Sequence, residues 1–151
     1  MPLLFVLKIC HFTAVAVWIG AGLGAPRDVR RTLLLGQPHT KELMVRLKRT
    51  AQLMNGAALA TIATGLLLVF AAGGFGRIPH RIHLGLALTG AVYLAGRYLI
   101  RPVIVQIAES TRRDLAPEEA HRLGRRFSAA VGVEDLLRLV VLVLMAYPFS
   151  F

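Results

Sequence analysis

The sequence is poor in cysteine and lacks several motifs that mark soluble enzymes. Cys10 is its one cysteine, so no internal disulfide can form and cysteine says nothing about the redox compartment. There is no Cys-x-x-Cys-His motif for a covalent c-type haem, and no G-x-x-x-x-G-K or G-x-G-x-x-G motif for a nucleotide. A serine nucleophile elbow is also absent. The usual signatures of nucleotide-dependent enzymes and serine hydrolases are therefore excluded.

Acidic residues are scarce too. Only 8 residues are Asp or Glu, against 18 Lys and Arg, which gives a formal net charge of +10. The basic residues gather in two segments, 26–50 and 101–127, that connect apolar stretches. Such clusters are typical of the cytoplasmic side of membrane proteins. We therefore interpret the charge as a topology signal and an attraction to anionic membrane lipids, and not as a nucleic-acid interface.

Apolar residues make up 56% of the chain, against about 45–50% in ordinary soluble domains. They form stretches of about 20 residues, the length of a helix that crosses the hydrocarbon core. The sequence predicts an all-α, integral membrane four-helix bundle in one domain, 1–151, with helices at about 2–25, 51–72, 82–100 and 128–148. The basic connections then lie inside, and both termini lie on the outer, periplasmic side of a bacterial inner membrane.

Two histidines fall in the outer half of this predicted membrane domain. His11 lies in the first span and Trp18 follows seven residues later, on the same helix face. His83 opens the third span, and Gly90 follows at the same spacing. Two imidazoles in one leaflet are suited to be axial ligands of a b-type haem, with Trp18 and Gly90 beside the cofactor. The alternative is that the histidines are hydrogen-bonded polar residues and that the glycines serve helix packing.

Charged and polar side chains gather in the inner half. The fourth span carries Glu134, Asp135 and Arg138, and the spacing of Glu134 and Arg138 permits a salt bridge. The residues expected at the same depth on other spans are Arg27, Asn55 and Arg97. We take Arg27, Glu134 and Arg138 as candidate catalytic residues that position protons or an anionic group. The alternative is a structural charge network that fixes helix order.

At this point the sequence resembles a known family. His11, Trp18 and the pair Pro26-Arg27 have the spacing of the first helix in HemJ-type protoporphyrinogen oxidases and the related CopD-like membrane proteins. The segment from Phe127 through Glu134 to the terminal Pro-Phe pair is similar to that family's last helix. The resemblance covers most of the chain.

The resemblance implies a haem-b protein that performs electron transfer or oxidises a porphyrin- or quinone-like partner. His11 and His83 correspond to the family's haem-ligand histidines. The third helix of the family usually carries Trp-x-His-x-Lys, whereas this chain has Arg81 at the tryptophan position and Gly85 at the lysine position. The resemblance therefore implies haem binding more directly than oxidase activity.

Two other functions stay open at the level of sequence. A CopD-like copper-handling transporter would bind copper through His11 and Cys10 and would hold no porphyrin. A purely structural subunit would use the polar cluster for packing alone. Close helix packing also suggests a homo-oligomer, for which the sequence sets no stoichiometry.

The predicted topology has a direct test. We expect a reporter that works only outside the cytoplasm to be active when it is fused after Phe151, because the basic connections hold the other ends of the helices inside. As a control, the same reporter fused after Lys48, within the first basic connection, should be inactive. Activity of a cytoplasm-only reporter after Phe151 would contradict the orientation.

Overall fold

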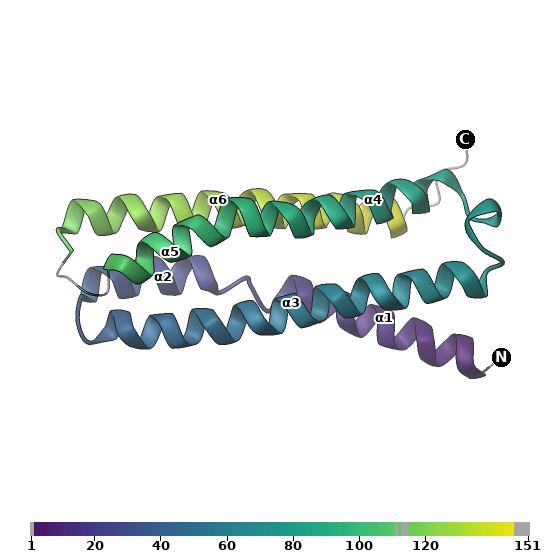
Figure 1. Cartoon of the computed structure of the whole chain (residues 1–151), viewed down its shortest axis with the longest axis horizontal. Helices are drawn as coiled ribbons and strands as arrows, with labels where there is room; N and C mark the ends of the chain where they lie inside the picture. Colours follow the sequence, from purple (N-terminus) through teal and green to yellow (C-terminus); the bar gives the residue numbers. More distant parts are fainter. Residues whose placement is uncertain (1, 111, 113–114, 147–151) are drawn as a thin grey trace.

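The computed structural model describes residues 2–110, 112 and 115–146. The regular elements of this part of the chain are all helical, as predicted (Figure 1). In chain order they are α1 (Pro2–Gly20), α2 (Ala25–Leu35), α3 (His39–Ala71), the 3-10 helix η1 (Phe75–Arg77), α4 (His80–Ala95), the π-helix η2 (Gly96–Ile100), α5 (Arg101–Ser110) and α6 (Pro117–Ala146).

The long helices α3 and α6 run along the length of the molecule, and the other helices pack against them (Figure 1). At one end, α1 packs on α3 and α4 packs on α6. At the other end, α2 packs on both α6 and α3, and α5 packs on α6. Each half of the molecule therefore has its own set of packed helices, with α3 and α6 common to both.

The first predicted helix, 2–25, is wrong at its C-terminal end, because the helix stops earlier and a second helix begins at Ala25. Helix α1 ends at Gly20, and α2 carries Pro26 in its first turn, where a missing N–H costs nothing. In the break, the Ala25 backbone N–H donates to the Gly22 carbonyl at 3.0 Å. Glycine at positions 20, 22 and 24 weakens a continuous helix across this segment.

The predicted basic connections are also largely helical. The segment 26–50 holds α2 and the first part of α3, and the segment 101–127 holds α5 and the first part of α6. These parts are amphipathic, because they bury apolar residues such as Val29, Leu43 and Ile107 while their basic residues stay exposed. The predicted end of the fourth helix, at 148, lies outside the described residues.

The third helix does not stop at Arg101-Pro102, as its predicted range implied. Proline lacks the N–H of an α-helical bond, and its ring crowds the carbonyl four residues earlier. Directly before Pro102 the helix widens into the π-helix η2 and then continues as α5. A local change of helical register is a known way to carry a helix past such a residue.

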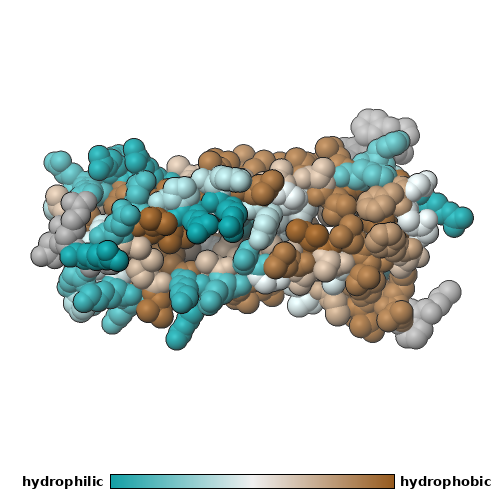
Figure 2. Space-filling model, viewed as in Figure 1, coloured by the Kyte–Doolittle hydropathy of each residue, from teal (hydrophilic) through white to brown (hydrophobic). Residues whose placement is uncertain are grey.

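The two halves have separate hydrophobic cores. The core between α2, α3, α5 and α6 consists of Val29, Leu33, Leu43, Leu47, Ile107, Ala120, Leu123, Phe127 and Val131. The other core consists of Trp18, Ala57, Ala58, Val92 and Val141. The surface is divided in the same way. In Figure 2, hydrophilic residues gather over the half that contains the first core, and hydrophobic residues gather over the half that contains the second core. We call the halves the polar half and the apolar half.

Three helical stretches are long and apolar enough to cross a membrane: Leu3–Leu35, His39–Ala71 and His80–Ser110. Helix α6 is not among them, because Glu134, Asp135 and Arg138 interrupt its apolar part. Many large apolar side chains of the apolar half nevertheless point outward, including Phe12 at 68% and Leu136 at 62% exposure. Exposed apolar surface on this scale is characteristic of a face that lipid covers.

Candidate functional site

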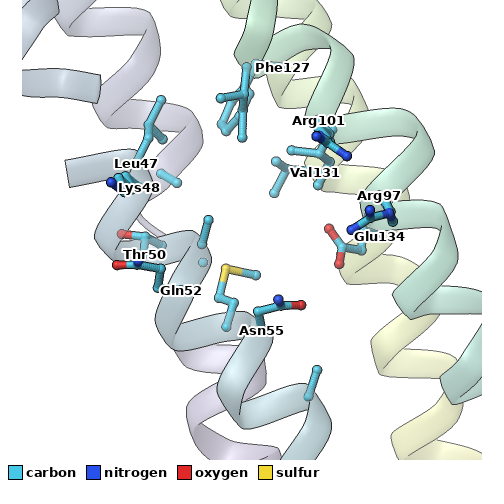
Figure 3. Close-up of a pocket in the computed structure, with 18 of the residues that line it drawn as sticks. Leu47, Lys48, Thr50, Gln52, Asn55, Arg97, Arg101, Phe127, Val131 and Glu134 are labelled. Atoms are coloured by element: carbon cyan, nitrogen blue, oxygen red, sulfur yellow. The ribbon is translucent and has the colours of Figure 1, made fainter. Parts of the chain in front are cut away.

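A cavity of about 700 Å³ lies where the two hydrophobic cores meet (Figure 3). Leu47, Phe127 and Val131 line it from the core of the polar half. Trp18 and Ala58 line it from the core of the apolar half. Its size lies within the range of small-molecule sites, and a mostly apolar wall with a few polar groups is their usual lining.

The polar groups of the cavity come from three sides. Its charged and amide-bearing side chains are Lys48, Gln52 and Asn55 of α3, Arg97 of η2, Arg101 of α5, and Glu134 and Arg138 of α6. Figure 3 shows Glu134 reaching from α6 toward Asn55 on α3, with Arg97 and Arg101 on the same side as Glu134. The site therefore offers an apolar interior, several cations and one carboxylate that faces the cavity.

Arg138 is the centre of a buried ion network. Its side chain is 2% exposed, and it donates to Asp135 Oδ1 at 2.8 Å and to Glu134 Oε1. Glu134 is itself only 5% exposed. Both carboxylates lie on the same helix as the arginine, at the i,i+3 and i,i+4 spacings that bring side chains together. The salt bridge that the sequence spacing permits is thus present.

Trp18 joins this network from α1. The Arg138 guanidinium carbon lies 5.2 Å from the Trp18 ring centroid, within the range of a cation–π interaction. Arg138 Nε is buried, and the described residues supply no hydrogen-bond partner for it. A polar atom of a bound molecule or a water is the natural partner for such a donor.

The π-helix η2 brings backbone close to Glu134. A Cβ atom placed on Gly96 would lie 2.8 Å from Glu134 Oε1, so a larger residue here would displace the carboxylate. π-helical turns often occur at functional sites. Here η2 carries Arg97 to the cavity, next to Arg101 at the start of α5.

His11 packs against α3. Its Nδ1 lies 2.9 Å from Thr64 Oγ1, and the Thr64 hydroxyl donates to the Ala60 carbonyl at 2.6 Å. Because that hydroxyl hydrogen is already used, Thr64 accepts from His11 Nδ1–H, which leaves the lone pair on Nε2. This is the tautomer of a histidine that binds a metal through Nε2. Gly65 is also close, since a Cβ there would lie 3.3 Å from the His11 ring.

His83 has different neighbours. Its ring centroid lies 5.9 Å from that of Phe75 and 6.0 Å from that of His80. His83 Nδ1 is buried and finds no hydrogen-bond partner among the described residues. Neither His11 nor His83 is among the described residues that line the cavity, so the histidines and the cavity are separate features.

The remaining predicted site residues are divided between these features. Trp18, Glu134 and Arg138 line the cavity, whereas Arg27 lines a second hollow between α2 and α6. Gly90 is half-buried, and a Cβ there would meet nothing within 4 Å. The space beside Gly85 is already occupied, because Met145 Cε lies 2.8 Å from the position of its missing Cβ.

Asn55 and Arg97, expected at the depth of Glu134 and Arg138, do line the cavity with them, whereas Lys48, Gln52 and Arg101 were not predicted there. Lys48, Gln52 and Asn55 succeed one another at spacings of four and three, which places them on one face of α3. Arg97 and Arg101 are likewise four residues apart. From the charge pattern alone, Lys48, Arg97 and Arg101 are expected at the ends of the spans, where they face solvent. The packing of α3 against the facing helices brings them to one site.

No family model, curated protein or solved structure matches the chain. Among the described residues, no three His, Cys, Asp or Glu side chains come together as a group that could hold a metal ion. Cys10 is exposed and free.

The ion network generates a stability prediction. Arg138→Gln leaves the buried Glu134 and the half-buried Asp135 without their cation, so we expect it to destabilise the protein by about 3–5 kcal/mol. The triple variant Glu134→Gln/Asp135→Asn/Arg138→Gln removes the cation and both carboxylate charges. It should recover most of the stability that Arg138→Gln loses. Thermal unfolding in detergent measures both changes.

The control for this prediction is Arg126→Gln, an exposed arginine on the same helix. It should unfold like the parent protein, since surface substitutions usually change stability little. If Arg138→Gln unfolds at the same temperature as this control, the network has no stabilising role.

Proposed function

We propose that the chain is a multi-pass protein of the bacterial inner membrane, with four crossing segments and both termini on the periplasmic side. The three apolar stretches, the outward-facing apolar side chains and the basic polar half support this placement. In it α6 is the fourth span, and its three charged residues lie inside the bundle, where they bind one another.

Within this placement the protein is a redox protein that acts on a porphyrin- or quinone-like molecule. The observation that carries the proposal is the cavity at the junction of the two cores, with its apolar wall and its cations. A porphyrin is a flat, apolar ring with carboxylates on one edge. Its ring suits the wall formed by Trp18, Phe127 and Val131, and its carboxylates suit Lys48, Arg97 and Arg101.

The cavity also contains a group suited to handle a proton. Oxidation of a porphyrinogen or a quinol releases protons as well as electrons. Glu134 faces the cavity and is held in place by Arg138, so it is the carboxylate in position to accept a proton from the bound molecule. Asn55, on the opposite wall, is positioned to orient the ring by hydrogen bonding.

A b-type haem is the cofactor that the HemJ-like resemblance implies, and each of the two expected ligand residues has a ring nitrogen available to bind iron. His11 carries its proton on Nδ1 and therefore offers Nε2, while His83 has a buried nitrogen without a hydrogen-bond partner among the described residues. Neutral imidazoles are standard axial ligands, and the bound haem would supply a one-electron carrier. Thr64 would then fix the orientation of the His11 ring.

The histidines generate a spectroscopic prediction. We expect purified protein to show a Soret band that shifts on reduction with dithionite, and His11→Ala and His83→Ala each to lose or change it. His39→Ala is the matched control, because His39 is exposed at the start of α3, and it should keep the parent spectrum.

Other results would overturn the haem assignment. Parent-like spectra from both His11→Ala and His83→Ala would remove these residues as ligands. A protein that stays colourless after haem is added would rule out the haem assignment. In that case copper analysis of the parent and of Cys10→Ser would test the copper-handling alternative.

The cavity generates a binding prediction of its own. Trp18 is the only tryptophan in the chain and lines the cavity, so its fluorescence reports occupation. We expect protoporphyrin IX to quench it saturably. Arg97→Gln/Arg101→Gln should raise the Kd about tenfold or more, because two charge-assisted contacts are lost.

The matched control is Arg122→Gln/Arg126→Gln, which removes the same charge from exposed positions on α6. This variant should bind as the parent does. Equal weakening in both variants would show a general charge effect, and unsaturable quenching would show that the cavity is not the binding site.

A further inference from the structure

The second hollow, about 620 Å³, lies between α2 and the first half of α6. The described residues that line it are of two kinds. The basic members are Arg27, Arg30, Arg31 and His121. The other members are Leu23, Pro26, Leu34, Ala120 and Ser128. No carboxylate is among the described residues that line it, so the hollow is strongly cationic.

The one acidic residue of α2 is turned away from this face. Asp28 accepts from Arg46 of α3 at 2.9 and 3.1 Å, and also from Thr32 at 3.1 Å. These bonds hold the carboxylate on the side of α2 that faces α3. The arginines on the other side therefore do not have Asp28 as a counter-ion, and an anion from outside the chain is suited to balance their charge.

The hollow also has an apolar end. Leu23 lies in the break between α1 and α2, beside the apolar half, and its side chain is 62% exposed. Ser128 offers little to an anion, because its hydroxyl donates to the Gly124 carbonyl at 2.8 Å. Recognition thus rests on the basic side chains, with the exposed Leu23 at the end of the hollow nearest the apolar half.

We propose that this hollow binds the headgroup of an anionic phospholipid from the inner leaflet. The phosphate would lie among Arg27, Arg30 and Arg31, and an acyl chain would run past Leu23 along the apolar half. Basic pockets between helices on the cytoplasmic side are known sites for such headgroups. The inference rests on the proposed membrane placement, but it is independent of the haem and of the porphyrin cavity.

The test begins with protein extracted from the membrane fraction by detergent, which establishes the membrane placement separately. The protein is titrated with dioleoyl phosphatidylglycerol or dioleoyl phosphatidylcholine, and bound lipid is counted by native mass spectrometry. We expect phosphatidylglycerol to bind about tenfold or more tightly than phosphatidylcholine. Equal binding of the two lipids would overturn the proposal.

Arg27→Gln/Arg31→Gln is the variant that should abolish this preference. Arg30 is left in place because its side chain packs on α6, where a Cβ on Gly124 would lie 3.0 Å from Arg30 Cγ. Arg125→Gln/Arg126→Gln is the control, with the same charge change at exposed positions on α6 outside the described lining of the hollow. The control should keep the preference. If both variants lose the preference for phosphatidylglycerol equally, the preference depends on net charge alone and the proposed site is wrong.

The last experiment is a competition with inorganic phosphate, because a free phosphate and a lipid headgroup present the same anionic group. Phosphate at millimolar concentration should not displace phosphatidylglycerol, since it lacks the acyl chains. Displacement would assign the hollow to a soluble anion and overturn the lipid proposal. The Soret band of the parent protein, measured in the same samples, records a failure of the haem assignment separately.

Discussion

Arg138 holds two carboxylates on the apolar part of α6, and the surrounding structure is arranged about that interaction. An ionised carboxylate buried without a partner is very costly, so the buried Glu134 depends on the guanidinium, which also binds the half-buried Asp135. Trp18 closes over the arginine from α1, and the Gly96 backbone of η2 approaches Glu134 from another side. Three elements distant in sequence are thereby fixed around one network.

The cavity lies beside this network because the two hydrophobic cores do not merge. The core of the polar half ends near Phe127 and Val131, and the core of the apolar half begins near Trp18 and Ala58. Between them the polar side chains of α3, η2 and α6 face one another, so apolar residues cannot close the space. A molecule with one apolar and one anionic part matches both kinds of wall.

The sequence alone predicted the features that depend on residues close together in the chain. The apolar stretches predicted membrane-length helices, and the i,i+4 spacing of Glu134 and Arg138 permitted their salt bridge. Within the basic segments, the helices α2 and α5 were missed because charge was given more weight than period. Val29 and Leu33, four residues apart, already mark a buried face in the segment assigned to a connection.

Features that depend on contacts between distant elements could not be predicted. The partner of His11 is Thr64, 53 residues away, and no local pattern links the two. The cavity was foreseen only in part: Asn55, Arg97, Glu134 and Arg138 were expected at one depth, but no local pattern joins them to the apolar walls from α1 and α3.

The charged residues of α6 also bear on how the protein is made. On a scale of insertion free energies, a charge at the centre of a span costs about 2.5–3.5 kcal/mol, whereas each Leu or Val returns only about 0.3–0.6 kcal/mol. As an isolated segment α6 is therefore a poor substrate for the insertion machinery. It comes after α1 and η2 in the chain, so Trp18 and the Gly96 backbone are synthesised before it. In the proposed membrane placement, delivery of this helix into the lipid is accordingly a step of tertiary assembly, and damage at Trp18 would first appear as a biogenesis defect.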